Sequence, residues 1–377
     1  MDDRPASPGV GGDVARRGGT ARGRVSRRRF LGWCSGLALA PALVGCSQSG
    51  GGARPPNARA GGTSPAPAPT SGAATPQALG SMRINWNSLS GSMAGIWMAD
   101  ETGAWRECGI EPELSNITSS SKVLPALIAN DIDGSALDVL VGVRGIAGGT
   151  DVVFLAGMTN KQVFSVFARP EIQGPAELAG KEWGITRVGS STDVASHLAL
   201  EQWGLSGDDI TFVQLGTTAN IFAALQSGQI AAGTLSPPNT IEAKAAGLKE
   251  LINLAEDGPD VPSVGLAMMR ESMDQRPELA SCFVRGYALG VKRLREDKDA
   301  AIAMFRKYLR TDDQQVLEGI WDLYRRYLAW PPTIPAAGLE YVKRVAAEDD
   351  PQAASIPNDQ IFDGRFVEQL RAEGLFG

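Results

Sequence analysis

Short β-type runs alternate with helical segments between residues 82 and 270, and this alternation limits the fold more than any other feature. The run at 82–86 precedes a helical pattern at 92–105, and the run at 113–117 precedes one at 122–130. Further strands are predicted at 138–141, 152–155, 162–169, 182–186, 211–214, 230–235, 248–253 and 264–269. Further helices are predicted at 193–203, 219–227, 241–246 and over most of the chain after 277. Such alternation is typical of α/β proteins, in which helices cover both faces of mostly parallel sheets.

The two β-α-β series are separated by extended segments, which predicts two lobes. Residues 81–166 would begin lobe 1, residues 167–265 would form lobe 2, and residues 266–377 would return to lobe 1 and supply the C-terminal helices. The chain would cross at 163–169 and again at 264–269, and two crossings make a hinge. Open parallel sheets bind ligands outside the carboxyl ends of their strands, so we expect a ligand cleft between the lobes.

An apolar segment near the N-terminus predicts export rather than a membrane span. The segment at 30–44 is about 15 residues long, shorter than the ~20 that a spanning helix needs, and Pro41 interrupts it. Adjacent arginines precede it in SRRRFL at 26–31, and it closes on the sequence LVGC that ends at Cys46. This order resembles a twin-arginine export signal ending in a bacterial lipobox. Residues 1–46 would then be the signal peptide with its lipobox, and Cys46 would carry an acyl anchor outside the cytoplasm.

The alternative for residues 1–46 is a basic tail with a chance apolar stretch.

Residues 47–80 are rich in Gly, Pro, Ser, Thr and Ala and have no acidic residue, so they predict a disordered linker. Its mean reach of about 30 Å would tether a folded domain near a membrane.

The charge of the chain argues against nucleic acid as a partner. The whole chain carries −6, and residues 1–45 hold eight arginines against three aspartates, so residues 46–377 carry −11. An acidic protein of this kind neither neutralises phosphates nor adheres to anionic lipid through charge.

Two of the four cysteines would remain in the folded region. Cys34 would leave with the signal and Cys46 would take the lipid, which leaves Cys108 and Cys282. A disulfide between them requires that the fold bring them together, and the sequence leaves this open.

Several motifs in the folded region resemble one family. They are LAGKEWGITRVGSSTD at 178–193, GLSGDDI at 204–210, AALQSGQI at 223–230, SPP at 236–238 and GAWRECGIE at 103–111. In this order they resemble the substrate-binding proteins of ABC transporters of the nitrate, sulfonate, taurine and thiamine-precursor type. The resemblance covers about residues 82–270. The chain departs from the family at Ala231, where Asp is usual, and in a shorter stretch at 130–150.

This resemblance implies a two-lobe periplasmic-binding-protein type II fold and a function. The protein would be a lipid-anchored receptor that delivers a small molecule, either a sulfonate- or nitrate-like anion or a planar heterocycle, to an ABC importer. Its partners would be a membrane permease and an ATPase. It would need no cofactor and no metal, would catalyse no reaction, and is expected to be a monomer.

The loop at 189–193 is the first candidate ligand contact. It links a predicted strand to a helix, so the hydroxyls of Ser190, Ser191 and Thr192 would stand beside the free N–H groups of the first turn. Such a site suits an anion or a carbonyl group. The alternative is plain capping, because Ser190 and Asp193 have the spacing of a capping box.

Polar residues after the other predicted strands are further candidates. Asn87, Ser88 and Ser90 follow the first strand, and Ser120 and Ser121 precede a helix. The alternatives are a polar turn for the first group and helix capping for the second.

Gly142 would let a ligand approach the backbone, and Arg144 and Arg187 would pair with an anionic ligand through a bidentate fork. Surface ion pairs are the alternative for both arginines. Pro237 lies in the SPP motif after another strand.

For three other residues, a structural role explains the sequence better than ligand binding does. Trp86 and Trp97 offer stacking surfaces for a planar ligand, but burial in the core explains them better. His197 has Asp193 and Glu201 four residues away on either side, which indicates a solvated helix face.

Two other classes of function compete with the receptor. An enzyme on the same fold, such as a desulfinase or a pyrimidine-precursor synthase, would need a nucleophilic cysteine with histidine and arginine partners, or a histidine and a lysine for a cofactor. The single histidine and Cys108 lie far apart in sequence. The effector lobe of a transcription regulator is a third class, which the export signal and the lack of a DNA-binding motif disfavour.

Overall fold

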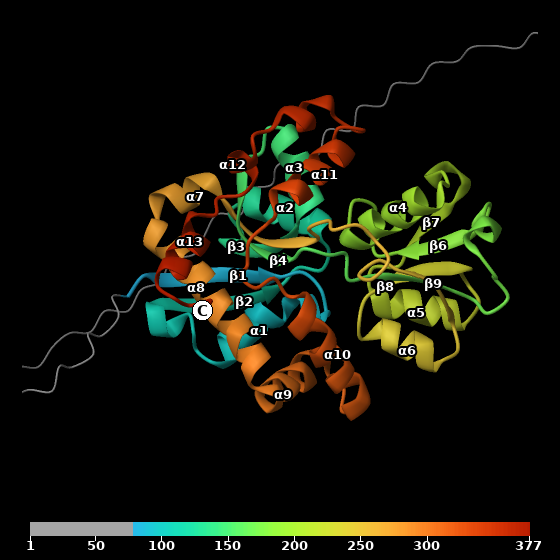
Figure 1. Ribbon diagram of the computed structural model, residues 1–377, viewed down its shortest axis with the longest axis horizontal. Coiled ribbons are helices and arrows are strands. Elements are labelled where there is room, and N and C mark those ends of the chain that lie inside the picture. Colours follow the sequence, from blue (N-terminus) through green and yellow to red (C-terminus); the bar gives the residue numbers. More distant parts are fainter. Residues whose placement is uncertain (1–77) are drawn as a thin grey trace, which may run out of the picture. The chain divides into compact units, whose positions relative to one another are not determined.

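A computed structural model describes residues 78–377, and two five-stranded mixed sheets organise this part of the chain (Figure 1). The predicted signal peptide, lipobox and most of the linker lie outside the described residues. The first sheet has the strand order β2-β1-β3-β10-β4 and the second has the order β7-β6-β8-β5-β9. We call the first sheet with its helices lobe 1 and the second lobe 2. No helix of the described region has the length and apolar character that a membrane crossing requires.

The first three strands of lobe 1 run parallel to one another. β1 (Gly80–Trp86) pairs with β2 (Ile110–Asn116) on one side and with β3 (Gly134–Asp138) on the other. β10 (Val264–Met269) is antiparallel to both β3 and β4 (Val152–Thr159). β3 and β4 are buried along their whole length, as expected for strands covered on both faces.

Lobe 2 repeats this plan. β6 (Glu182–Ile185) is parallel to β7 (Thr211–Gln214) and β8 (Ala232–Leu235). β5 (Ser165–Ala168) is antiparallel to β8 and to β9 (Lys249–Asn253). In each sheet the reversed strand is therefore the first one that the chain forms after it crosses between the lobes.

The crossings lie at residues 160–164 and 254–263, a few residues before the segments predicted. β5 and β10 each belong entirely to one sheet and do not bridge the lobes. The two crossing segments are bonded to each other, because Lys161 Nζ lies 2.8 Å from Asp260 Oδ1 and the Leu254 N–H donates to the Phe164 carbonyl at 2.9 Å.

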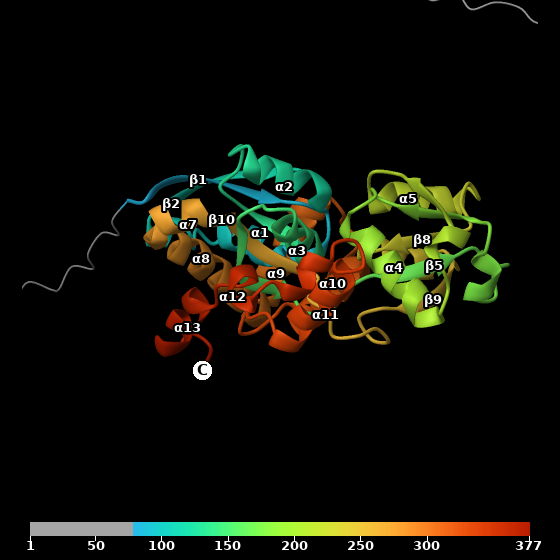
Figure 2. The ribbon, with the colours of Figure 1, turned by 90° about the horizontal axis from the view of Figure 1, so that it is seen from above.

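The C-terminal helices complete lobe 1, and Figure 2 shows them beside the lobe 1 elements. They are α7 (Arg270–Gln275), α8 (Pro277–Glu296), α9 (Lys298–Leu309), α10 (Gln314–Tyr327), α11 (Ala336–Ala346), α12 (Asn358–Ile361) and α13 (Arg365–Ala372). α8 packs closely on α1 (Ala94–Glu101), since a Cβ placed on Gly290 would lie 2.3 Å from the Gly95 carbonyl oxygen. Glycine at 290 therefore permits a contact between helix backbones.

The prediction of a strand at 138–141 was wrong. β3 ends at Asp138, and α3 (Val139–Ala147) begins there. Asp138 Oδ1 accepts hydrogen bonds from the N–H groups of Leu140 and Val141 at 3.0 and 3.3 Å, which caps the helix. The apolar run that follows belongs to a largely buried helix, which periodicity over so few residues cannot distinguish from a strand.

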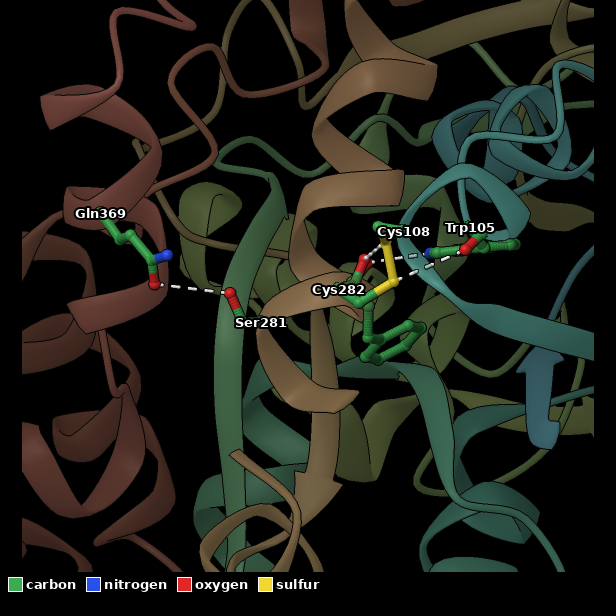
Figure 3. Close-up of a disulfide and its surroundings, with 6 residues drawn as sticks. Trp105, Cys108, Ser281, Cys282 and Gln369 are labelled. Carbon is green, nitrogen blue, oxygen red and sulfur yellow. Dashed lines mark hydrogen bonds between the residues drawn. A yellow bond between two sulfur atoms is a disulfide. The ribbon is translucent and has the colours of Figure 1, made fainter. Parts of the chain in front are cut away.

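A disulfide joins the two cysteines whose pairing the sequence left open. Cys108 ends the short 3₁₀ helix η2 (Arg106–Cys108), and Cys282 lies in the first half of α8, with 5.8 Å between their Cα atoms (Figure 3). Beside the bond, Trp105 Nε1 donates to the Phe283 carbonyl at 3.0 Å. The disulfide thus fastens the beginning of lobe 1 to its C-terminal return.

Candidate functional site

A cleft of ≈ 380 Å³ is lined by residues from both lobes. Its lobe 1 side follows the carboxyl ends of β1 and β2, and its lobe 2 side follows the carboxyl ends of β6, β7 and β8. This is the position expected for a ligand of an open parallel sheet. Hydroxyl and amide side chains line most of it: Asn87, Ser88, Ser90, Ser92, Asn116, Thr118, Ser119, Ser120, Thr186, Ser190, Ser191, Thr192, Thr217, Thr218, Ser236 and Asn239.

Among the described residues, α6 (Asn239–Ala245) begins at the cleft, and three longer helices also begin there. They are α2 (Ser120–Ile128) in lobe 1, and α4 (Ser191–Trp203) and α5 (Thr218–Gln226) in lobe 2, and the first residue of each lines the cleft. The N–H groups of a helix's first turn have no partner within the helix, and the helix dipole is positive at that end. The cleft therefore offers hydrogen-bond donors and partial positive charge from both lobes.

The candidate loop at 189–193 both caps its helix and lines the cleft. Ser190 Oγ accepts from the Asp193 N–H at 3.4 Å, and Asp193 Oδ2 accepts from the Gly189 N–H at 2.7 Å. The buried hydroxyls of Thr186, Ser190 and Thr192 are bonded to one another at 2.8–2.9 Å. These three hydroxyls hold the loop in shape, whereas Ser191 stands half-buried at the start of α4.

The lobe 1 wall is also held by buried hydrogen bonds. Asn87 Nδ2 donates to Ser120 Oγ at 2.9 Å, and Ser120 Oγ accepts from the Asp138 N–H at 3.2 Å. Ser90 Oγ lies 2.8 Å from the Tyr324 hydroxyl of α10. Ser119, just before α2, has a φ of 82°, a strained conformation for a residue with a side chain. Strain of this kind persists where the surrounding structure imposes it, which is common at binding sites.

Asp138 lies behind the cleft, where the two lobes meet. Its carboxylate is fully buried, and Oδ2 has no hydrogen-bond partner among residues 78–377. Burial raises the pKa of this carboxyl to about 6, against the opposing effects of the Ser191 hydroxyl, the capped N–H groups and Arg144. Ser191 belongs to lobe 2, so an ionisable group of lobe 1 is in electrostatic contact with the start of α4.

Five predicted contacts lie outside the residues that line this cleft. Arg144 is paired with Asp349 at 2.6 Å, which is the ion-pair alternative considered for it. Gly142 lies in α3, where a Cβ would come within 2.4 Å of the Phe154 ring, so its lack of a side chain serves packing. Ser121 bonds to Ser119 at 3.1 Å.

The other two are Arg187 and Pro237. Arg187 is half-buried, and its backbone N–H donates to Ser190 Oγ at 3.4 Å. Pro237 lines a second cavity of ≈ 300 Å³, beside the first crossing and α10, while its neighbour Pro238 lines the cleft itself.

Sequence analysis missed many residues of the cleft wall, and four of them bear on the choice of ligand. Phe164 comes from the first crossing, Phe222 from the second turn of α5, and Asn239 and Glu242 from α6 (Asn239–Ala245). The position of α6 directly after β8 was the available signal, because it repeats the pattern of α4 after β6. The tryptophans considered for stacking do not line the cleft. The Trp97 ring stacks on the Tyr308 ring with 4.8 Å between centroids, and the Trp86 ring meets the Trp97 ring edge-on at 5.4 Å.

The family model described as NMT1/THI5 like matches residues 90–301, more than half of the chain. The chain belongs to this family. The matched segment contains most of the cleft walls, from Ser90 in the loop after β1 to the whole of lobe 2. No curated protein sequence matches the chain significantly.

Solved structures share the fold of this NMT1/THI5-like protein at low sequence identity. A protein from Bordetella bronchiseptica RB50 superposes with a TM-score of 0.70 at 19% identity, covering 78% of this chain and 98% of that one. The nitrate-binding protein NrtA from Synechocystis PCC 6803 gives 0.65 at 13% identity, with 80% and 92% covered. The alkanesulfonate-binding protein SsuA from Xanthomonas axonopodis pv. citri, bound to MOPS, gives 0.62 at 17%, with 74% and 95% covered. The predicted periplasmic-binding-protein fold is confirmed.

Proposed function

We propose that this protein is an extracytoplasmic solute receptor that delivers a small molecule to an ABC importer. The observation that carries the proposal is the cleft itself, which both lobes line with hydroxyls, amides and helix N-termini at the carboxyl ends of their strands. These groups bind and orient a polar solute, but they do not form a set of acid, base and nucleophile. The two crossings at 160–164 and 254–263 leave each lobe its own sheet, so the lobes can rotate about a hinge.

The ligand proposed is a small polar molecule, either a sulfonate- or nitrate-like anion or a planar heterocycle. Helix N-termini favour anionic or partially negative atoms, and the rings of Phe164 and Phe222 suit a planar face. The binding of nitrate and alkanesulfonate by proteins of the same fold supports this range. A permease and an ATPase are the proposed partners of a monomeric receptor.

We expect ligand to draw the lobes together, because a ligand stabilises the closed form only through contacts made to both lobes. Ligands can be found by thermal shift, since a molecule that binds only the folded state raises its stability. With such a ligand at saturation, small-angle scattering should show a smaller radius of gyration than the free protein. Identical curves with and without ligand would contradict closure.

Export as a lipoprotein is the second part of the proposal, and it rests on the sequence around Cys46. Substitution Cys46→Ala should move the protein from the membrane fraction to the soluble extracytoplasmic fraction, because one acylated cysteine is the proposed anchor. Fractionation followed by immunoblotting measures this, and Cys34→Ala is the matched control within the signal. A mutant that stays in the membrane pellet at wild-type yield would refute the anchor.

The enzyme alternative finds less support at this site. Cys108 and Cys282 are joined in a disulfide and line no part of the cleft. His197 is exposed on α4, where its Nε2 lies 3.6 Å from Asp193 Oδ1. It is not among the residues that line the cleft. A receptor needs none of these groups, whereas a desulfinase or a pyrimidine-precursor synthase needs a reactive side chain beside its substrate.

A further inference from the structure

Glu242 is the only residue with an ionisable side chain among the described residues that line the cleft. It stands half-buried on α6, one turn after Asn239. We infer that Glu242 determines specificity, and that the ligand carries an amino group or another N–H-bearing nitrogen that binds this carboxylate. The inference rests on the proposed receptor function and narrows its range of ligands.

The Glu242 carboxylate is held in place, but only one of its two oxygens accepts a hydrogen bond from the described residues. Asn239, which is buried, donates from Nδ2 to Glu242 Oε2 at 2.7 Å. Within residues 78–377, no hydrogen bond reaches Oε1, and no Lys, Arg or His nitrogen lies within 4.0 Å of the carboxylate. The nearest basic residue of α6, Lys244, is paired with Glu250 at 2.7 Å. Glu242 therefore presents a fixed acceptor, and no cation of the described part of the chain lies beside it.

Closure of the lobes would remove water from this carboxylate. A buried charge costs free energy unless an opposite charge or a hydrogen-bond donor compensates it. Because the described cleft wall supplies no cation, the ligand is the group that can supply compensation. An ammonium or amino nitrogen would do so, whereas a wholly anionic ligand would be repelled.

The rest of the cleft suits the other end of such a molecule. The first turns of α2, α4 and α5 and the hydroxyls around them offer donors to an acceptor or anionic group. Phe222, one turn into α5, and Phe164 offer apolar surface to the part of the ligand between its nitrogen and its acceptor group. The ligand class is thus a small molecule with a nitrogen donor at one end and an acceptor group at the other.

Matched pairs of probes test this inference on the purified full chain. Each pair differs only in an amino group replaced by a methyl group: aminoethanesulfonate against propanesulfonate, aminobutyrate against pentanoate, and aminopyrimidine against methylpyrimidine. Nitrate is added as an anion without an N–H donor. Calorimetric titration of each probe is compared for wild type, for Glu242→Gln and for Glu182→Gln. Glu182 is the matched control, because it is an exposed glutamate at the start of β6 in the same lobe.

We expect the amino member of at least one pair to bind wild type tenfold or more tightly than its methyl partner. Glu242→Gln should abolish this preference, while Glu182→Gln should keep it. Melting curves of both variants should match wild type, which separates binding from folding. If the methyl members or nitrate bind more tightly, or if Glu242→Gln leaves the preference unchanged, the receptor function stands and the role of Glu242 falls. If no probe of any pair binds, both proposals fall.

Discussion

Substitution Cys108→Ser is expected to lower the free energy of unfolding by up to about 5 kcal/mol, the largest change that we predict for a single residue. The disulfide closes a loop between residues 174 positions apart, and a loop of this length removes much conformational entropy from the unfolded chain. Cys108 is the better position for the change because it is half-buried, so a serine hydroxyl there can be hydrated, whereas Cys282 is buried.

Chemical denaturation of wild type and variant, each with and without a reducing agent, measures this effect. Oxidised wild type should unfold at a clearly higher denaturant concentration than the variant, and reduction should bring wild type down to the variant. The reducing agent should leave the denaturation midpoint of the variant unchanged, so the variant controls for other effects of the reducing agent. Equal midpoints for oxidised wild type and variant would show that the bond adds no stability.

The second large effect is a pH dependence of stability that originates at Asp138. Burial raises the pKa of its carboxyl to about 6 in the folded protein, above the 3.8 of an unperturbed aspartate. The folded state therefore binds the proton more tightly than the unfolded state, and its stability falls as the pH rises from about 4 through about 6. At 1.36 kcal/mol for each unit of pKa, the loss amounts to about 3 kcal/mol.

Asp138→Asn should remove this dependence. An asparagine oxygen can still accept from the N–H groups of Leu140 and Val141, so the cap of α3 is kept while the charge is lost. The variant should gain stability relative to wild type as the pH increases from 4 to 7, which unfolding curves at a series of pH values measure. Asp313→Asn is the matched control, because Asp313 caps α10 in the same way with an exposed side chain. A constant difference between wild type and Asp138→Asn at all pH values would contradict the prediction.

The sequence by itself determined the class of fold and the edge of each sheet that forms the cleft. Strand and helix periods are set by neighbouring residues, so the alternation in residues 82–270 was readable without the structure. Capping is equally local, and the loop of Ser190, Ser191 and Thr192 begins a helix at the cleft for that reason. Where the local signal was ambiguous, at 138–141, the prediction failed, because an apolar run of four residues suits both a buried strand and a capped helix.

Only the tertiary structure decided which charges reach the ligand cleft. Arg144 follows a strand end as a binding arginine would, but it pairs with Asp349 from the C-terminal region. Glu242 carries no local mark of function, and it enters the cleft wall because α6 follows β8 at the edge that faces lobe 1. The pairing of Cys108 with Cys282 has the same origin, since it depends on α8 returning to the beginning of lobe 1. Contacts between residues far apart in the chain are set by the packing of whole elements, which no local pattern records.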